Sequence, residues 1–169
     1  MRMKNSNYDP LAAYATPTVA ERLRGLAGGS SLFLSLLLGA SVFLLYWHTL
    51  SNPLVFDDKP FFSAANLKQY GASLFHFDLR WLPYASFGWT YNLFGMDLFW
   101  FRLGNIGLHA LSCIALFVFL SRLVTAAQPQ ESAPPSQWPA FFAALIFALH
   151  PAAVYGVAYL VERSIILAT

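Results

Sequence analysis

Apolar residues gather in three long stretches of the chain that contain no charged side chain. These stretches cover residues 25–56, 103–121 and 132–161. A helix needs about 20 mostly apolar residues to cross the hydrocarbon core of a bilayer. The pattern therefore predicts three membrane-spanning helices, at 31–50, 98–123 and 138–150.

The third stretch is interrupted by Pro151, and this leaves two interpretations open. One kinked helix crosses the membrane, or a span ends at His150–Pro151 and the segment 152–169 begins a further membrane helix. Apolar positions continue in helical spacing to the last residue, which favours the second interpretation. The sequence ends within that pattern, without a cap or polar tail, as a fragment of a longer protein would.

Loop charges predict the orientation of these helices. The segment 1–30 carries four Lys and Arg residues against two acids, and a polar, Pro-rich connector at 124–137 follows Arg122. Positive residues favour the cytoplasmic side of a membrane. We therefore expect 1–30 and 124–137 to be cytoplasmic, and the loop 51–97 to lie outside.

The outer loop is too aromatic for a solvated loop, since residues 51–102 hold 15 of the 29 aromatic side chains. Pro83 suits the first turn of a helix that stops at Gly95, and Pro60 suits the start of a short helix, PFFSAANLKQY. An apolar stripe of helical spacing begins on the helix of Pro83 and consists of Phe87, Tyr91, Phe94, Leu98 and Phe101. The stripe indicates either an amphipathic helix on the membrane surface or a helix that packs on other spans.

Composition narrows the class of protein. The chain is 57% hydrophobic and 11% charged, whereas a soluble domain is about 25% charged. A net charge of +2 is too small for binding driven by nucleic-acid phosphates, and Cys113, the single cysteine, cannot form an internal disulfide. These values indicate an all-α, polytopic membrane protein with three to four transmembrane helices and a helical outer loop on the membrane surface.

The sharpest chemical feature is the acidic pair Asp57–Asp58, just beyond the first predicted span. A carboxylate at this boundary can accept a proton from a hydroxyl or position a cation. The alternative is structural: Asp58 caps the helix that begins near Pro60, and Asp57 is solvated.

Cations suited to an oxyanion lie on the same side. Arg163 follows Glu162 within the last apolar run, and its planar guanidinium can bind a phosphate. A mutual Glu162–Arg163 ion pair is the structural alternative. Arg80 lies in the outer loop, and we expect Arg102 to reach from the start of the second span to the membrane interface.

The histidines do not have the spacing of a metal site. His76 and Asp78 could join the acidic pair at a metal, but the pattern gives this weak support. Asn105 and His109 lie four residues apart, so we expect them on one helix face, bonded to a neighbouring helix. We expect Cys113 to pack as a small apolar side chain.

Four stretches in order carry a family resemblance over residues 50–169: NPLVFDDKPFF, RWLPYASFGWTYNLFG, FRLGNIGLHAL and ALIFALHPAAVYGVAYLVERSIILAT. Together they resemble the amino-terminal membrane part of a GT-C superfamily glycosyltransferase. The closest likeness is to protein O-mannosyltransferase-like proteins that carry tetratricopeptide repeats. The resemblance implies a GT-C-like helical fold with an active site at the outer membrane boundary.

The resemblance also implies an activity: transfer of a sugar from a polyprenyl-phosphate-linked donor to a Ser or Thr hydroxyl of an acceptor protein. On this analogy Asp57 and Asp58 are the catalytic candidates, with Asp57 preferred as the base. Arg163 and Arg80 would bind the lipid phosphate.

The candidates for supporting roles are Glu162, His150, Asn105 and His109. No metal ligands are expected, although a divalent metal remains an option. We expect an integral protein of a bacterial cytoplasmic membrane whose partners are the bilayer, the lipid-linked donor and the acceptor, and not nucleic acid. The alternative is a small, non-catalytic membrane subunit that binds a partner protein or lipid.

Overall fold

The computed structural model describes residues 29–55, 57–72, 80–127 and 135–168, and within them all regular structure is helical. The predicted all-α class is confirmed. The chain divides into two units, Met1–Phe33 and Leu34–Thr169, and the second contains nearly all described residues. Most of the predicted cytoplasmic segment 1–30, the middle of the 124–137 connector, and His76 and Asp78 lie outside the described residues.

Two helical segments are long and apolar enough to cross a membrane, Ser30–Ser51 and Leu98–Ala127. The first consists of α2 (Gly29–Tyr46) and the short 3-10 helix η2 (Trp47–Ser51). The second is α6 (Leu98–Ala127), which has 30 residues. At 1.5 Å per residue α6 is about 45 Å long, so it exceeds a hydrocarbon core of about 30 Å.

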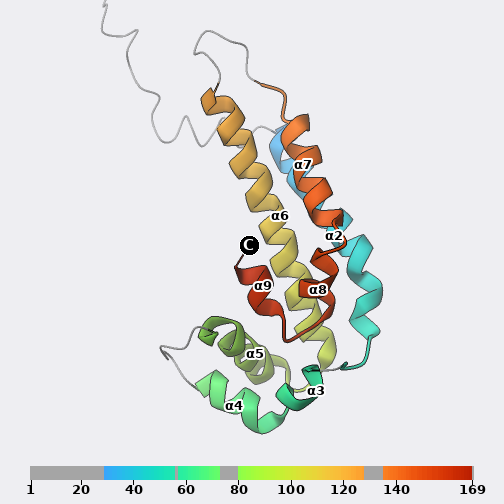
Figure 1. The fold of residues 1–169 in the computed structure, drawn as a ribbon, viewed down its shortest axis with the longest axis vertical. Helices are drawn as coiled ribbons and strands as arrows, with labels where there is room; N and C mark the ends of the chain where they lie inside the picture. The colour runs from blue at the N-terminus through green and yellow to red at the C-terminus, as the bar shows by residue number, and fades with distance from the viewer. Residues whose placement is uncertain (1–28, 56, 73–79, 128–134, 169) are drawn as a thin grey trace, which may run out of the picture. The chain divides into compact units, whose positions relative to one another are not determined.

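The third predicted membrane-spanning helix, α7, is shorter than a span and is not one of the two candidate spans. It covers Trp138–Leu149, and its 12 residues extend about 18 Å. It packs along α6 (Figure 1). Helix α7 ends where the sequence predicted a break, at His150–Pro151, because proline provides no N–H to continue the helix.

The segment after the break differs from the single helix expected over 152–169. It forms two short helices, α8 (Ala153–Ala158) and α9 (Arg163–Leu167), joined by an irregular turn at 159–162. Both helices pack against α6, and they also pack against each other. The polar contacts that stabilise this turn are the centre of the candidate site below.

Three short helices form the described part of the loop 51–97: α3 (Asp58–Phe61), α4 (Ala64–Ala72) and α5 (Trp81–Phe94). The single helix expected over PFFSAANLKQY is therefore split. Ser63 caps the start of the second piece, because its Oγ accepts a hydrogen bond from the Asn66 backbone N–H at 3.3 Å.

The predicted limits of α5 agree with the structure. Pro83 lies in the first turn, and the helix ends at Gly95, whose φ of 70° favours glycine. The apolar stripe does not stay on one helix, because Gly95 separates α5 from α6. Within the stripe Phe87 and Phe101 are buried, whereas Phe94 is exposed.

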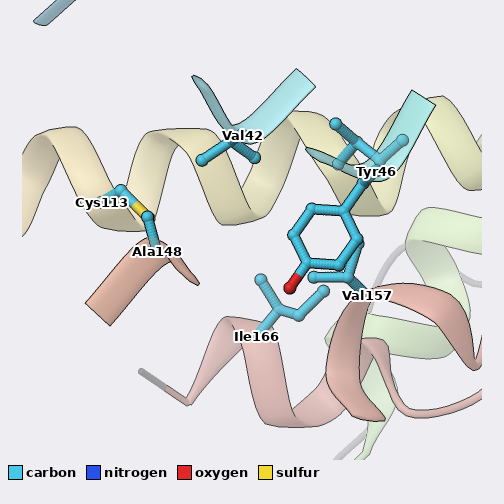
Figure 2. Packing of buried hydrophobic residues seen from close by; sticks show 7 residues of the cluster. Val42, Tyr46, Cys113, Ala148, Val157 and Ile166 are labelled. Carbon is cyan, nitrogen blue, oxygen red and sulfur yellow. The ribbon is translucent and has the colours of Figure 1, made fainter. Parts of the chain in front are cut away.

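Three apolar clusters follow one another along α6, and they are named inner, middle and outer from its carboxyl end to its amino end. The inner cluster joins α2, α6 and α7, and it consists of Leu34, Leu38, Phe117, Ala140, Phe141 and Ala144. The middle cluster, shown in Figure 2, consists of Val42, Tyr46, Ile106, Cys113, Ala148, Val157 and Ile166. The outer cluster consists of Phe62, Leu67, Phe87, Phe101 and Leu160.

Cys113 lies in the middle cluster, fully buried and close to Ala148 (Figure 2). The prediction that it packs as a small apolar side chain is confirmed. In the same view the ring of Tyr46 extends from α2 toward Val157 and Ile166. The middle cluster therefore packs α8 and α9 against the two long helices.

Candidate functional site

The site forms around the irregular turn at 159–162, where backbone carbonyl groups lack helical partners. Asn105, on α6, is fully buried and points its amide at these carbonyls. Its Nδ2 lies 3.4–3.5 Å from the carbonyl oxygens of Gly156, Val157, Tyr159 and Leu160. Because a buried, unpaired carbonyl is costly, Asn105 stabilises a backbone path that a continuous helix would not need.

Arg102 lies one helical turn before Asn105 and performs a similar task. Its guanidinium donates to the carbonyl oxygens of Ala158 at 3.1 Å and Pro53 at 2.8 Å. The side chain is 1% exposed, so the prediction that Arg102 reaches the membrane interface is wrong. The physical reason is that two otherwise unpaired carbonyls lie within its reach inside the protein.

Arg163, the first residue of α9, is the most fully bonded cation of the site. Its Nε donates to Asn105 Oδ1 at 2.6 Å, and its two NH groups donate to Ser86 Oγ and to the Phe101 carbonyl at 2.9 Å each. The guanidinium carbon lies 3.9 Å from the centre of the Phe87 ring. These contacts join α5, α6 and α9 through one side chain.

The burial of Arg163 has an electrostatic consequence. Helix α9 lies outside the two candidate spans. Desolvation lowers the pKa of Arg163 to about 9, which leaves the side chain protonated at neutral pH. The structure thus holds a buried positive charge next to Gly104, where an added Cβ would approach the guanidinium to 3.0 Å.

Asp58 connects the loop 51–97 to the same turn. It is 0% exposed, and its Oδ1 accepts a hydrogen bond from the Val161 backbone N–H at 2.9 Å. The expectation that Asp58 caps the helix near Pro60 is wrong because α3 begins at Asp58 itself, whereas Asp57 is exposed, as the structural alternative expected. Its second oxygen, Oδ2, is buried and has no partner in the described residues.

The Asp58–Val161 bond also places two further acids. Asp57 precedes Asp58 and is exposed, and Glu162 follows Val161 and is half-buried. Both occupy cap positions, before α3 and before α9, without a side-chain capping bond. One hydrogen bond between residues 103 positions apart thus brings two chain neighbours with carboxylates to the same junction.

The remaining predicted residues lie outside this junction. Arg80 is exposed directly before α5. His150 is exposed after α7, and its Nδ1 accepts from the Ala152 N–H at 3.2 Å. His109 lies deeper along α6, with Nε2 3.3 Å from the Ala148 carbonyl oxygen.

The expectation that Asn105 and His109 bond neighbouring helices is confirmed by these contacts. The sequence reasoning missed Ser86 as a partner of Arg163, and it missed the burial of Arg102. Arg102, Asn105 and His109 follow one another at spacings of three and four. This spacing puts them on one face of an otherwise apolar helix, and it was the signal for a polar contact.

Within the described ranges, no group of three or more His, Cys, Asp or Glu side chains is arranged to hold a metal ion. No protein-family model, curated protein or solved structure matches the chain. The junction offers an exposed carboxylate at Asp57, a half-buried one at Glu162 and a buried cation at Arg163.

Proposed function

We propose that this chain is the amino-terminal membrane portion of a GT-C-type glycosyltransferase. It transfers a sugar from a polyprenyl-phosphate-linked donor to a Ser or Thr hydroxyl on the outer membrane face. The observation that carries the proposal is the Asp58–Val161 hydrogen bond, which ties the acidic loop to the turn that leads into Arg163. Such a transfer needs a carboxylate that accepts the proton of the acceptor hydroxyl and a cation that stabilises the departing phosphate.

The two adjacent acids have different roles in this proposal. Asp57 is exposed, so its carboxylate can reach an acceptor hydroxyl and remove its proton as the bond to the sugar forms. Asp58 is buried and bonded to the backbone, so it acts through Val161 as a positioning residue. Glu162 lies beside the junction and supports the orientation of the acceptor.

The cations stabilise the negative charge that develops on the lipid phosphate as the glycosidic bond breaks. Arg80 is exposed and is the candidate for direct contact. Arg163 donates three hydrogen bonds to protein groups. In this proposal Arg163 contributes a fixed positive potential at the junction, and Arg80, which lies outside the junction, adds positive charge for the lipid phosphate.

The topology of the proposal follows the loop charges. The segment 1–30 and the 124–137 connector are cytoplasmic, and α3, α4 and α5 lie outside a bacterial cytoplasmic membrane. Helices α2 and α6 span the bilayer. The α7–α8 pair forms a third, broken span. The irregular turn at 159–162, which follows α8, is acceptable at the membrane boundary because protein side chains pair the backbone carbonyls there.

The test uses the full-length protein in lipid nanodiscs, with polyprenyl-phosphate-linked radiolabelled mannose, glucose or galactose and a pool of Ser- and Thr-containing peptides. The wild-type protein should transfer label from one of these donors to peptide. Asp57→Asn should lower the rate by about 100-fold or more, since general-base catalysis contributes at least that much. Asp58→Asn should retain partial activity, because the amide oxygen still accepts the Val161 N–H.

The matched control is Asp97→Asn, another exposed acid of the outer region. Asp97 Oδ1 accepts the Phe99 N–H at 3.0 Å, and asparagine can make the same bond. This variant should transfer label at the wild-type rate. An Asp57→Asn rate equal to that of Asp97→Asn would remove the catalytic role, and absence of transfer from all three donors by the wild-type protein would contradict the enzyme.

A second candidate function is a non-catalytic membrane subunit that binds a partner protein or lipid. The observation in its favour is that Asp58, Arg102 and Arg163 are buried and bond to the protein itself. Such a network can exist for stability alone. This function predicts that wild type and Asp57→Asn give the same background in the transfer assay while both insert into membranes.

A further inference from the structure

Helix α5 is apolar on a face that the rest of the described protein leaves uncovered. Its buried residues, Pro83, Ala85, Phe87 and Gly88, face the neighbouring helices. Leu82, Trp89 and Leu93 are instead 48%, 42% and 75% exposed. Their spacings of seven and four residues place them on one face of the helix, so the exposure forms a stripe and is not scattered.

This stripe continues onto the first turn of α6, one of the two candidate spans. The Phe94 ring stacks on the Trp100 ring, with centroids 4.1 Å apart and planes 13° apart. Trp100 and its neighbour Phe99 are themselves partly exposed. The ring contact therefore fixes the carboxyl end of α5 at the depth where α6 begins.

Charge separates this face from the rest of the outer region. Helix α5 contains no charged residue over its 14 positions. The exposed Lys68 and Gln69 lie on α4, the helix that packs against α5. Tryptophan and leucine without charge, next to the end of a span, are the side chains typical of the headgroup boundary of a bilayer.

We propose that the α5 lipid face, defined as Leu82, Trp89 and Leu93, inserts into the outer leaflet at the boundary of headgroups and acyl chains. It continues the lipid contact of the α6 start. The surface supports the α4–α5 pair on the membrane and holds the outer junction, with Asp57, at a fixed height above the bilayer. The inference depends on α6 spanning the membrane and not on sugar transfer.

The test places a nitroxide spin label on Leu93→Cys in the full-length protein, in nanodiscs of phosphatidylethanolamine and phosphatidylglycerol. The matched control is Gln69→Cys on α4, and the native chain, whose only cysteine is buried, is the labelling blank. Collisions with oxygen report lipid, and collisions with a water-soluble nickel chelate report water. Relative to the label at 69, the label at 93 should show a several-fold higher ratio of oxygen to nickel accessibility.

Two results would overturn the proposal. Equal nickel accessibility at 93 and 69 would place the α5 lipid face in water. Exclusion of both reagents from 93 would show that protein covers it, either a further segment of a longer chain or a partner.

A second measurement does not depend on the labelled variants. Lipids brominated near the headgroup should quench the tryptophan fluorescence of the native protein more than that of Trp89→Phe. An equal quenched fraction in the two proteins would contradict insertion of Trp89.

Discussion

The half of the helix assembly at the carboxyl end of α6, here called the inner half, and the half at its amino end, the outer half, are built on different principles. The inner half joins α2, α6 and α7 through the apolar cluster of Leu38, Phe117 and Ala144. The outer half joins α3, α5, α6, α8 and α9 through Asp58, Arg102, Asn105 and Arg163. The difference follows from backbone regularity: regular helices pair their own N–H and C=O groups, whereas the irregular turn at 159–162 needs side chains for this.

The two halves should differ in how well they tolerate substitutions. A cluster of apolar side chains around regular helices tolerates exchanges that keep volume. A buried polar network tolerates few exchanges, because each lost partner leaves another polar group unpaired. The outer half should therefore be the part of the molecule that is most sensitive to substitution.

Arg163→Met should give the largest loss of stability. The substitution removes three hydrogen bonds and the contact with the Phe87 ring, and it leaves Asn105 Oδ1 and the Phe101 carbonyl buried without that donor. Hydrogen bonds from a charged group contribute more than neutral ones, so we expect a loss of about 3 kcal/mol. Equilibrium unfolding in detergent micelles measures this.

The control for Arg163 is Arg122→Met, since Arg122 is an exposed arginine near the other end of α6. Its substitution should change the free energy of unfolding by less than about 0.5 kcal/mol. Equal effects of the two substitutions would mean that the outer network is not a centre of stability.

Gly88→Ala should destabilise the α4–α5 pair. A Cβ at Gly88 would collide with the backbone nitrogen and Cα of Gly71, so the helices must separate. Overpacking of this kind costs about 1–3 kcal/mol. Gly107→Ala is the matched control, because a Cβ there has no atom within 4 Å. Thermal unfolding should show a lower midpoint for Gly88→Ala only; equal midpoints would contradict the close approach.

Asp58→Leu should loosen the turn without unfolding the protein. The change leaves the Val161 N–H without its acceptor, at a cost of about 1.4 kcal/mol, which corresponds to about tenfold faster amide hydrogen exchange at Val161. Asp58→Asn retains an oxygen for this bond and should keep the amide protected. Fast exchange in both variants would show that charge, and not the hydrogen bond, stabilises the turn.

The sequence predicted the parts of the fold that depend on local pattern. The lengths of the apolar stretches predicted α2 and α6, Pro151 predicted the end of α7, and Gly95 predicted the end of α5. Each of these signals acts within a few residues of its effect. They define the helices, but they contain no information about which helices meet.

The site could be predicted only in part, for the same reason. Asn105 and His109 were identified as polar residues on one helix face, yet their partners on other segments lie 39 to 58 residues away. The burial of Arg102 depends on carbonyls of Pro53 and Ala158, on two other segments. The split of 152–169 into α8 and α9 likewise depends on Asn105, which no local signal near the turn reveals.

The smallest change in the free energy of unfolding is expected for a substitution in the inner half. Leu38 is fully buried in the inner cluster, and methionine has a similar volume and can adapt its shape to the same space. Leu38→Met should therefore change the free energy of unfolding by less than about 1 kcal/mol in the same micelle assay. A loss as large as that of Arg163→Met would mean that the inner half is also held by specific fit. The contrast between the halves would then lie in the kind of contact and not in its tolerance.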